Sequence, residues 1–236
     1  RLNPGASQLP PPMTSKERVL LALARQEPDR VPIDYFANPG IDQRLKQHFG
    51  LAADEHEGLL QTLHVDFRGV QAPYIGPRLH ADEPERGVMV DDWGIHRRWI
   101  EHDSGGYWDF CDFPLQEATE EQVAEWPLPS PDDFDYNVVR EQSWKFGDHA
   151  VYTGNAGLPD IINGNGMLRT MEQTLVDLIS DDPAGMLLAQ RRSEILLEIL
   201  SRSLEAARGG IDFVWLGEDL GTQIGPTISE PLYRRQ

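Results

Sequence analysis

The stretch Gly209-Gly210-Ile211-Asp212-Phe213-Val214-Trp215-Leu216 decides the fold class of this chain. Two glycines favour the left-handed backbone at which helices end. The six residues after them are almost all apolar, which is typical of a strand covered on both faces, as in a parallel sheet. The stretch therefore predicts a junction from a helix to a strand in a parallel α/β protein.

The residues before this junction repeat the same alternation of strand and helix. Ala150-Val151-Tyr152-Thr153 predicts a strand, and apolar residues at helical spacing predict a helix over 167–179, capped by Asn163 to Gly166. Asp182-Pro183 is typical of a helix start, and the apolar spacing after it predicts a long helix up to Ala207. Ser229-Glu230-Pro231 predicts the start of a further helix.

The N-terminal half contains shorter elements of the same kinds. Capping boxes at Thr14 and Thr119 predict helices that end before Pro28 and Pro127. The remaining expected elements are a first strand over 31–36, a helix over 41–49, a strand over 63–70, and a hairpin of 88–90 with 95–100 around Asp91-Asp92-Trp93-Gly94.

Strands that alternate with helices predict either an open doubly wound sheet or a barrel. No Gly-x-Gly-x-x-Gly follows any of the expected strands, so the barrel is favoured. We expect a (β/α)8 TIM-type barrel that is incomplete at its C-terminus, because a barrel takes about 250 residues and only roughly four or five strand candidates precede Gln236. This domain should cover 13–236, after a disordered extension over 1–12 that carries three consecutive prolines.

Charge and composition exclude several classes of protein. The 21 Lys and Arg against 39 Asp and Glu give a net charge of −18, which repels nucleic acids. A single cysteine, Cys111, allows no internal disulfide, and no apolar run approaches the roughly 20 residues of a membrane span. We expect a cytoplasmic protein. The seven histidines and one cysteine lack metal-ligand spacing, so no metal site is predicted.

Candidate catalytic residues follow from the rule that barrel enzymes place reacting groups at the C-terminal ends of strands. Glu218 and Asp219 follow the strand that ends at Leu216, and Asp34 lies within the first expected strand. Of two adjacent carboxylates, one should face the cleft and the other a loop or helix terminus. A desolvated carboxyl group has a raised pKa, which suits an acid or base near neutral pH. The alternative is that either carboxylate caps a helix or pairs with an arginine.

Substrate contacts are expected at five further positions. Asp66 and Arg68 lie two apart on one strand, so they either form an ion pair or together bind a substrate carboxylate. Asn155, among glycines, either offers its amide to a substrate or makes a turn. Tyr35, beside Asp34, and Gln223, beyond Asp219, complete the expected substrate-binding set.

Several motifs, taken in order, resemble the uroporphyrinogen decarboxylase superfamily, especially its divergent branch that includes corrinoid-linked methyltransferases. The resemblance covers the chain from about Met13 to its end. The matching stretches are Thr14 to Val19, Asp29-Arg30-Val31-Pro32, Val65-Asp66-Phe67-Arg68, Asp92-Trp93-Gly94, Gly217-Glu218-Asp219-Leu220-Gly221-Thr222-Gln223 and Ile228-Ser229-Glu230.

The resemblance implies a barrel with a deep cleft for a tetrapyrrole or a corrinoid-borne methyl group. Two departures bear on the reaction. Classical decarboxylases carry an arginine-rich stretch near the first strand, where this chain has Ile33-Asp34-Tyr35-Phe36. The methyltransferase branch depends on a zinc site of His-x-Cys plus a distant Cys, which the sequence to Gln236 does not contain.

The acidic charge favours corrinoid-dependent methyl transfer, with a methyl-corrinoid substrate and a partner corrinoid protein that docks over the barrel mouth. Zinc and corrinoid are the cofactors of that branch. Porphyrinogen decarboxylation is the alternative enzyme activity, and a non-catalytic barrel that binds a ligand or partner is another. A homodimer is compatible with each. A fragment that does not fold alone is the last alternative, because an unclosed barrel exposes two sheet edges.

Overall fold

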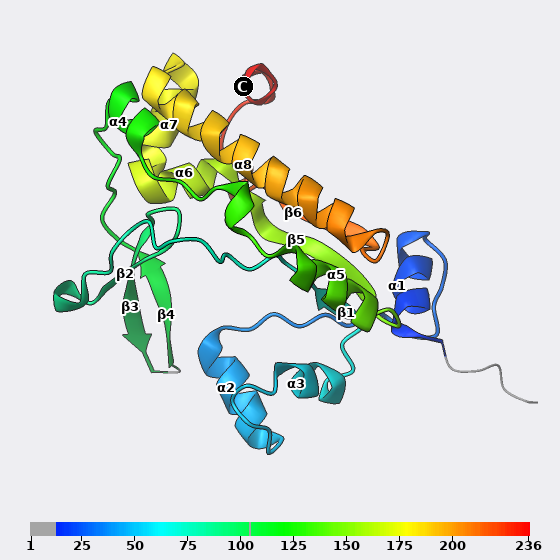
Figure 1. The fold of residues 1–236 in the computed structure, drawn as a ribbon. Coiled ribbons are helices and arrows are strands. Elements are labelled where there is room, and N and C mark those ends of the chain that lie inside the picture. The colour runs from blue at the N-terminus through cyan, green and yellow to red at the C-terminus, as the bar shows by residue number, and fades with distance from the viewer. Residues whose placement is uncertain (1–12, 104) are drawn as a thin grey trace, which may run out of the picture.

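The computed structural model describes residues 13–103 and 105–236, so the extension predicted over 1–12 lies outside the described residues. A parallel three-stranded sheet in the order β1-β5-β6 lies at its centre (Figure 1). Its strands are β1 (Phe67–Gly69), β5 (Ala150–Pro159) and β6 (Phe213–Gly217). The predicted α/β class, with a parallel sheet and helices, is confirmed. Within the described residues the sheet does not close into a barrel.

The helix α8 (Pro183–Ala207) packs against β5, and α5 (Tyr136–Lys145) packs along α8. Val70, Val139, Val151 and Ala207 form the buried core between them and the sheet. Each buried valine contributes about 1.5 kcal/mol or more through removal of apolar surface from water. α8 begins as predicted, since the side chain of Asp182 accepts a hydrogen bond from the N–H of Gly185. It ends in left-handed backbone at Arg208 and Gly209. The predicted junction from this helix to the strand after it is therefore also confirmed.

A second core joins the other end of α8 to α4 (Glu120–Glu125) and α6 (Ile161–Arg169). A third short helix, α7 (Met171–Ser180), packs against α6 and α8. The single helix predicted over 167–179 is wrong. Thr170 takes a φ of 68°, which breaks the chain into α6 and α7, and its hydroxyl caps α7 by accepting from the N–H of Gln173. Asn163 to Gly166 lie inside α6 and do not cap it.

The predicted hairpin forms part of an antiparallel meander of β2 (Val88–Val90), β3 (His96–His102) and β4 (Gly105–Phe110). Its first turn is fixed by Asp91, whose Oδ1 accepts from the N–H groups of Trp93 and Ile95. Gly94 has a φ of 82°, and a Cβ there would lie 2.5 Å from the ring of Trp126. The sequence did not predict β4. Figure 1 shows the meander as a separate sheet beside the helices.

The N-terminal part contains α1 (Ser15–Leu23), α2 (Pro39–His48) and α3 (His56–Thr62). The first strand predicted over 31–36 does not form. Of its residues, only the backbone of Ile33 is hydrogen-bonded to the segment beside it. The N–H of Ile33 donates to the Asp66 carboxylate, and its carbonyl accepts from the Asp66 N–H. The strand predicted over 63–70 shortens to β1, because His64 has a φ of 55° directly after α3.

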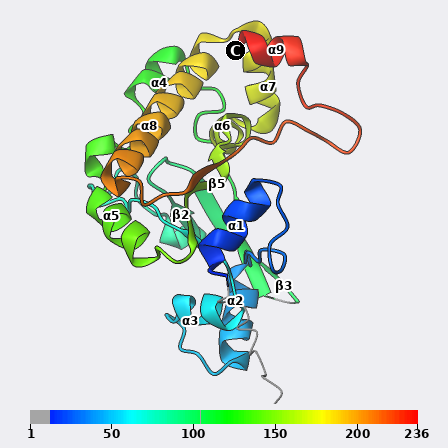
Figure 2. The ribbon, with the colours of Figure 1, turned by 90° about the vertical axis from the view of Figure 1, so that its right-hand side faces the viewer.

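The C-terminal segment differs from the prediction in one respect. β6 is not covered on both faces, as Leu216 is 55% exposed. Beyond it, α9 (Glu230–Arg235) begins at Ser229 as predicted. Figure 2 shows α9 beside α7, where Gln236 donates to the carbonyl of Leu178. Two short 3-10 helices, η1 (Pro84–Arg86) and η2 (Pro131–Asp133), complete the described elements.

Candidate functional site

A cavity of about 490 Å³ lies beside β1, one of the two edge strands of the parallel sheet as described. The extended segment 34–37 forms one wall, and α2, α3 and β5 contribute to the others. Three of the predicted site residues line it, namely Asp34, Tyr35 and Arg68. Tyr152, which was not among the predicted site residues, lines it as well.

Asp34 and Tyr152 are the two titratable groups of this cavity whose side chains bind no other side chain among the described residues. We call them the two free groups. Although much of Asp34 is exposed, burial of its carboxyl group raises its pKa. Among the described residues, its one hydrogen bond comes from the N–H of Tyr35, and it forms no ion pair. Burial, together with the charge of Asp34, raises the pKa of Tyr152 to about 12. Tyr152 therefore stays neutral at physiological pH and keeps its proton for donation.

Further aromatic rings pack against Tyr152 and Phe36 of the cavity wall. The ring of Tyr152 lies 5.5 Å from that of Phe213 and 5.6 Å from that of Trp215, and Phe36 lies 5.0 Å from Trp215. Gly69 stands opposite Tyr152 in the parallel ladder. A Cβ at this position would come within 3.0 Å of the Tyr152 ring. The absence of a side chain at Gly69 therefore allows the tyrosine to lie across β1.

The other charged groups of the cavity are already paired. Arg68 donates from Nε and Nη2 to the carboxylate of Glu57, at 2.8 and 2.9 Å. Asp42 lies 2.8 Å from Nζ of Lys46 and accepts from the hydroxyl of Tyr35 at 3.3 Å. Burial opposes the charge of Asp42, but the hydrogen bond and charge of Lys46 bring its pKa below the ordinary value.

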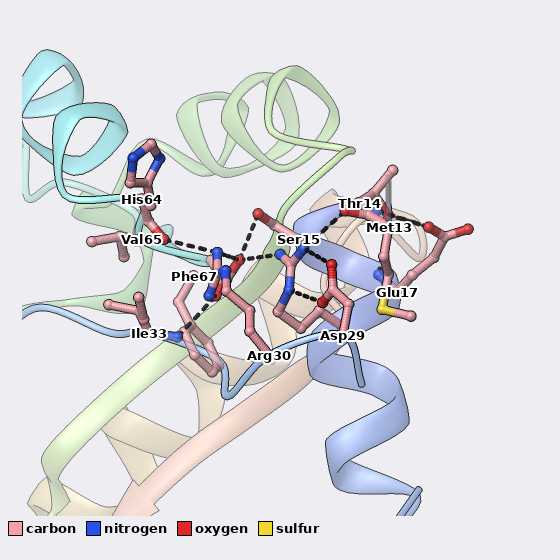
Figure 3. Close-up of polar contacts among 12 residues, drawn as sticks. Met13, Thr14, Ser15, Glu17, Asp29, Arg30, Ile33, His64, Val65 and Phe67 are labelled. Atoms are coloured by element: carbon pink, nitrogen blue, oxygen red, sulfur yellow. Dashed lines mark hydrogen bonds and ion pairs between the residues drawn. The ribbon is translucent and has the colours of Figure 1, made fainter. Parts of the chain in front are cut away.

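Asp66 and Arg68 do not pair with each other. The carboxylate of Asp66 is fully buried and binds Arg18 and Arg30 at 2.6 Å each. Figure 3 draws this cluster of polar contacts, with Ser15, Arg30 and Ile33 among the labelled residues. The Asp66 carboxylate also accepts from Ser15 and from the N–H of Ile33. Burial raises the pKa of Asp66, but these donors together hold it below the ordinary value. Asp66 thus joins α1, the segment after it and β1.

Glu218 and Asp219 lie away from this cavity. Glu218 caps α6 from a distance, because its carboxylate accepts from the N–H groups of Ile161 at 2.8 Å and Ile162 at 3.1 Å. Burial nevertheless raises its pKa. It lines a different cavity of about 550 Å³, with walls from α6, α8 and α9. Asp219 and Gln223 are exposed.

Asn155 lines a third, smaller cavity of about 150 Å³ on the α8 side of the sheet. Its Oδ1 accepts from the N–H of Gly157 at 2.7 Å, which is the turn interaction considered as an alternative. Its amide nitrogen has no partner among the described residues. Of the eight predicted site residues, only Asp34, Tyr35 and Arg68 line the same cavity. The others lie apart from it, namely Asp66, Asn155, Glu218, Asp219 and Gln223.

The sequence contained one signal for Tyr152. It is the aromatic residue at the end of an expected strand, one residue before Thr153 and two before Gly154. The partner glycine of that tyrosine, Gly69, lies 83 positions earlier, and its position opposite Tyr152 depends on strand register. Pattern reading along one chain does not supply this register.

The described residues do not fit a zinc site. Within 13–103 and 105–236, no group of three or more His, Cys, Asp or Glu side chains could hold a metal ion. Cys111 is the one cysteine of the chain, and burial raises the pKa of its thiol, which disfavours the thiolate that zinc needs.

No family model, no curated protein and no solved structure matches this chain. In the part of the chain that the structure describes, no helix has the length and apolar character needed to cross a membrane.

Proposed function

We propose that this chain is a cytoplasmic enzyme of the uroporphyrinogen decarboxylase type, and that the Asp34–Tyr152 cavity is its substrate site. The observation that supports this most is the combination of a carboxyl group of raised pKa and a neutral phenol in one cavity that aromatic side chains line. Perturbed titratable groups in a cavity are typical of catalytic sites. The three-stranded sheet would then form part of a barrel.

The charges of the cavity favour methyl transfer over porphyrinogen decarboxylation. A porphyrinogen carries many carboxylates, and these need free cations. Arg68 is neutralised by Glu57, and Lys46 by Asp42. An anionic macrocycle would also meet the unpaired Asp34. A methyl group and a neutral acceptor suit aromatic walls better.

The two free groups suggest a division of roles. As an acceptor forms its new bond to the methyl carbon, the methyl group would leave its corrinoid donor, which keeps the electron pair of the broken bond. Asp34 would take the proton that the acceptor loses, since a carboxyl group of raised pKa is a better base than an ordinary one. Tyr152 would donate its hydroxyl proton in a hydrogen bond to an oxygen or nitrogen of the bound substrate and so orient it. The corrinoid would come from a partner protein.

The test is a comparison of substrates with the full chain. Methylcobalamin, with a panel of thiol and alcohol acceptors, is followed by absorbance, and uroporphyrinogen is followed by chromatography of the porphyrin products. We expect methylcobalamin demethylation in the wild type and a loss of at least about 100-fold in Asp34→Asn, the scale of general acid–base catalysis. The matched control is Asp54→Asn, an exposed carboxylate outside the cavity.

Three results would contradict the proposal. Uroporphyrinogen turnover would assign the cavity to decarboxylation. Equal rates in Asp34→Asn and Asp54→Asn would remove Asp34 from the reaction. Binding of methylcobalamin without any turnover would favour a non-catalytic ligand-binding protein.

A further inference from the structure

The cavity of about 550 Å³ beside Glu218 has aliphatic walls. Apolar side chains line it from several elements, namely Ile161 and Ile162 of α6, Leu178 of α7, Met186 and Ala189 of α8, and Ile228. Cavities of this volume are typical of sites for small molecules. Such walls favour a ligand with an apolar body, because its binding removes apolar surface from water.

Glu218 is the one charged side chain among the described residues that line this cavity. Its carboxylate accepts from the two N–H groups at the start of α6 and forms no ion pair in the described part of the chain. A carboxylate can accept about four hydrogen bonds, so two acceptor positions remain. Burial and the neighbouring charge of Asp160 raise the pKa of Glu218, although the two N–H groups lower it. The start of α6 therefore does not fully compensate the charge of this carboxylate.

The uncharged polar groups of the cavity provide no counter-charge. The amide of Gln190 donates to the carboxylate of Glu194 at 2.8 Å, and the hydroxyl of Ser193 donates to the carbonyl one turn before it in α8. The hydroxyl of Tyr233, a half-exposed residue of α9, has no hydrogen-bond partner within 13–103 and 105–236. The cavity thus combines a carboxylate with apolar walls, and none of the described residues that line it is a cation.

Arg192 of α8 is a buried cation whose charge interacts with that of Glu218, but the two form no ion pair. Burial lowers the pKa of Arg192 to about 10, although nearby carboxylates, including that of Glu218, oppose this shift. Among the described residues, its one hydrogen bond runs from Nη1 to Oδ1 of Asn165, at 2.9 Å. Arg192 also does not line the cavity. The position of a cation inside the cavity is therefore open to a ligand.

We propose that this cavity binds an organic ammonium ion with a compact aliphatic body, and that Glu218 is its counter-ion. An ammonium group donates charge-assisted hydrogen bonds to a carboxylate, and these are stronger than neutral ones. An anion would instead meet the like charges of Glu218 and Asp160. The net charge of −18 also attracts cations to the protein. The cavity shares no lining residue with the Asp34–Tyr152 cavity, so this proposal does not depend on the function proposed above.

The experiment uses the full chain and three probes of one shape, namely adamantylamine, adamantanol and adamantanecarboxylate. At neutral pH the amine is a cation, the alcohol is uncharged and the carboxylate is an anion. Titration calorimetry and ligand-detected NMR measure their binding. We expect saturable binding of the amine, with the alcohol and the carboxylate at least about tenfold weaker, the effect of one charge-assisted hydrogen bond.

Glu218→Gln removes the charge but keeps an oxygen that can accept from the start of α6. This variant should weaken amine binding at least about tenfold and leave alcohol binding unchanged, because only the charge is lost. A purely structural role of Glu218 would affect both ligands equally. The matched control is Asp219→Asn, at an exposed neighbouring position that does not line the cavity, and it should leave amine binding unchanged.

A second variant keeps the test valid if Glu218→Gln does not fold. Ala189→Phe fills part of the cavity from α8 without a change in charge, so it should weaken binding of both the amine and the alcohol. Absence of saturable amine binding to the wild type, or equal affinities for the amine and the alcohol, would overturn the proposal. Unchanged amine affinity in Glu218→Gln or in Ala189→Phe, or an equal loss of both ligands in Glu218→Gln, would also overturn it. Asp34→Asn should leave amine binding unchanged while it removes the turnover proposed above, so the two proposals fail separately.

Discussion

The carboxylate of Asp66 lies 2.6 Å from Nη1 of Arg18, with no solvent exposure of the aspartate side chain. Arg18 also binds Asp29 through two of its nitrogens, so the arginine joins the segment after α1 to the start of β1. Hydrogen bonds and charges of these carboxylates raise the pKa of Arg18 despite its burial. The contact fixes the extended segment that carries Asp34.

Asp66→Ala should destabilise the fold by about 3–5 kcal/mol, because it leaves two arginines facing a buried, uncompensated site. Urea unfolding measures this free energy. Asp103→Ala, at an exposed position, should change it by no more than about 0.5 kcal/mol. A loss below about 1 kcal/mol at Asp66 would show that the cluster does not anchor α1.

Asp66 should also account for part of the acid sensitivity of the fold. Its folded-state pKa lies below the ordinary value of 3.8, so its stabilising effect is complete above pH 3.8 and is lost as pH falls through the lower, folded-state pKa. Unfolding free energies of the wild type and Asp66→Asn should therefore converge at acid pH. A difference in unfolding free energy between the two proteins that stays constant from neutral to acid pH would contradict this account.

The carboxyl group of Asp34 should affect the free energy of unfolding in the opposite direction to that of Asp66. Its folded-state pKa is raised, so its charged form weakens the fold once pH exceeds the ordinary value of 3.8. Asp34→Asn should therefore become more stable relative to the wild type as pH rises from 3 to 7. The same variant should lose the methyl-transfer activity proposed above. Thermal unfolding at several pH values measures this difference. A variant that loses stability at pH 7 would assign Asp34 a structural role.

Glu218→Ala should cost about 1 kcal/mol, the usual effect of removing a helix cap. Its carboxylate is the group that accepts from the first N–H groups of α6, since the side chain of Asp160 makes no capping hydrogen bond. Asp219→Ala is the control, because Asp219 is exposed. Equal urea midpoints for the two variants would mean that water caps α6 equally well.

Gly164→Ala should destabilise the protein, although alanine normally favours a helix interior by about 1 kcal/mol. The new methyl group would meet the guanidinium of Arg192 at 2.4 Å. Gly166→Ala is the matched control in the same helix, where the nearest atom lies at 3.3 Å. Calorimetric unfolding of both variants measures the difference. The Gly164 variant should be the less stable, and the reverse order would show that Arg192 moves aside freely.

Local sequence signals predicted the elements that local interactions determine. The start of α8 at Asp182-Pro183, the capping boxes at Thr14 and Thr119 and the turn at Asp91 are formed as expected, because each depends on residues within four positions. The strand over 31–36 failed, because its β-forming residues bond to the sheet through Ile33 alone.

The site was harder to predict because its groups meet through tertiary contacts. Asp34 and Arg68 were identified as polar residues near strands, yet their partners come from elsewhere: Tyr152 for Asp34 and Glu57 for Arg68. Glu218 was placed correctly at a strand end, but the helix that it caps begins 57 residues earlier in the chain. Arg192 has a helical, unremarkable sequence context and becomes unusual only through burial.

The composition of α6 has a consequence for motion. Asn163-Gly164-Asn165-Gly166 occupies its middle, and such residues do not sustain an isolated helix in water. Its order therefore comes from α7, α8 and the carboxylate of Glu218. We expect its amide hydrogens to exchange with deuterium sooner than those of α8, as in a segment that opens locally while the rest stays folded. Such opening would separate Asn165 of α6 from Arg192 of α8, so the buried guanidinium would meet water each time this helix opens.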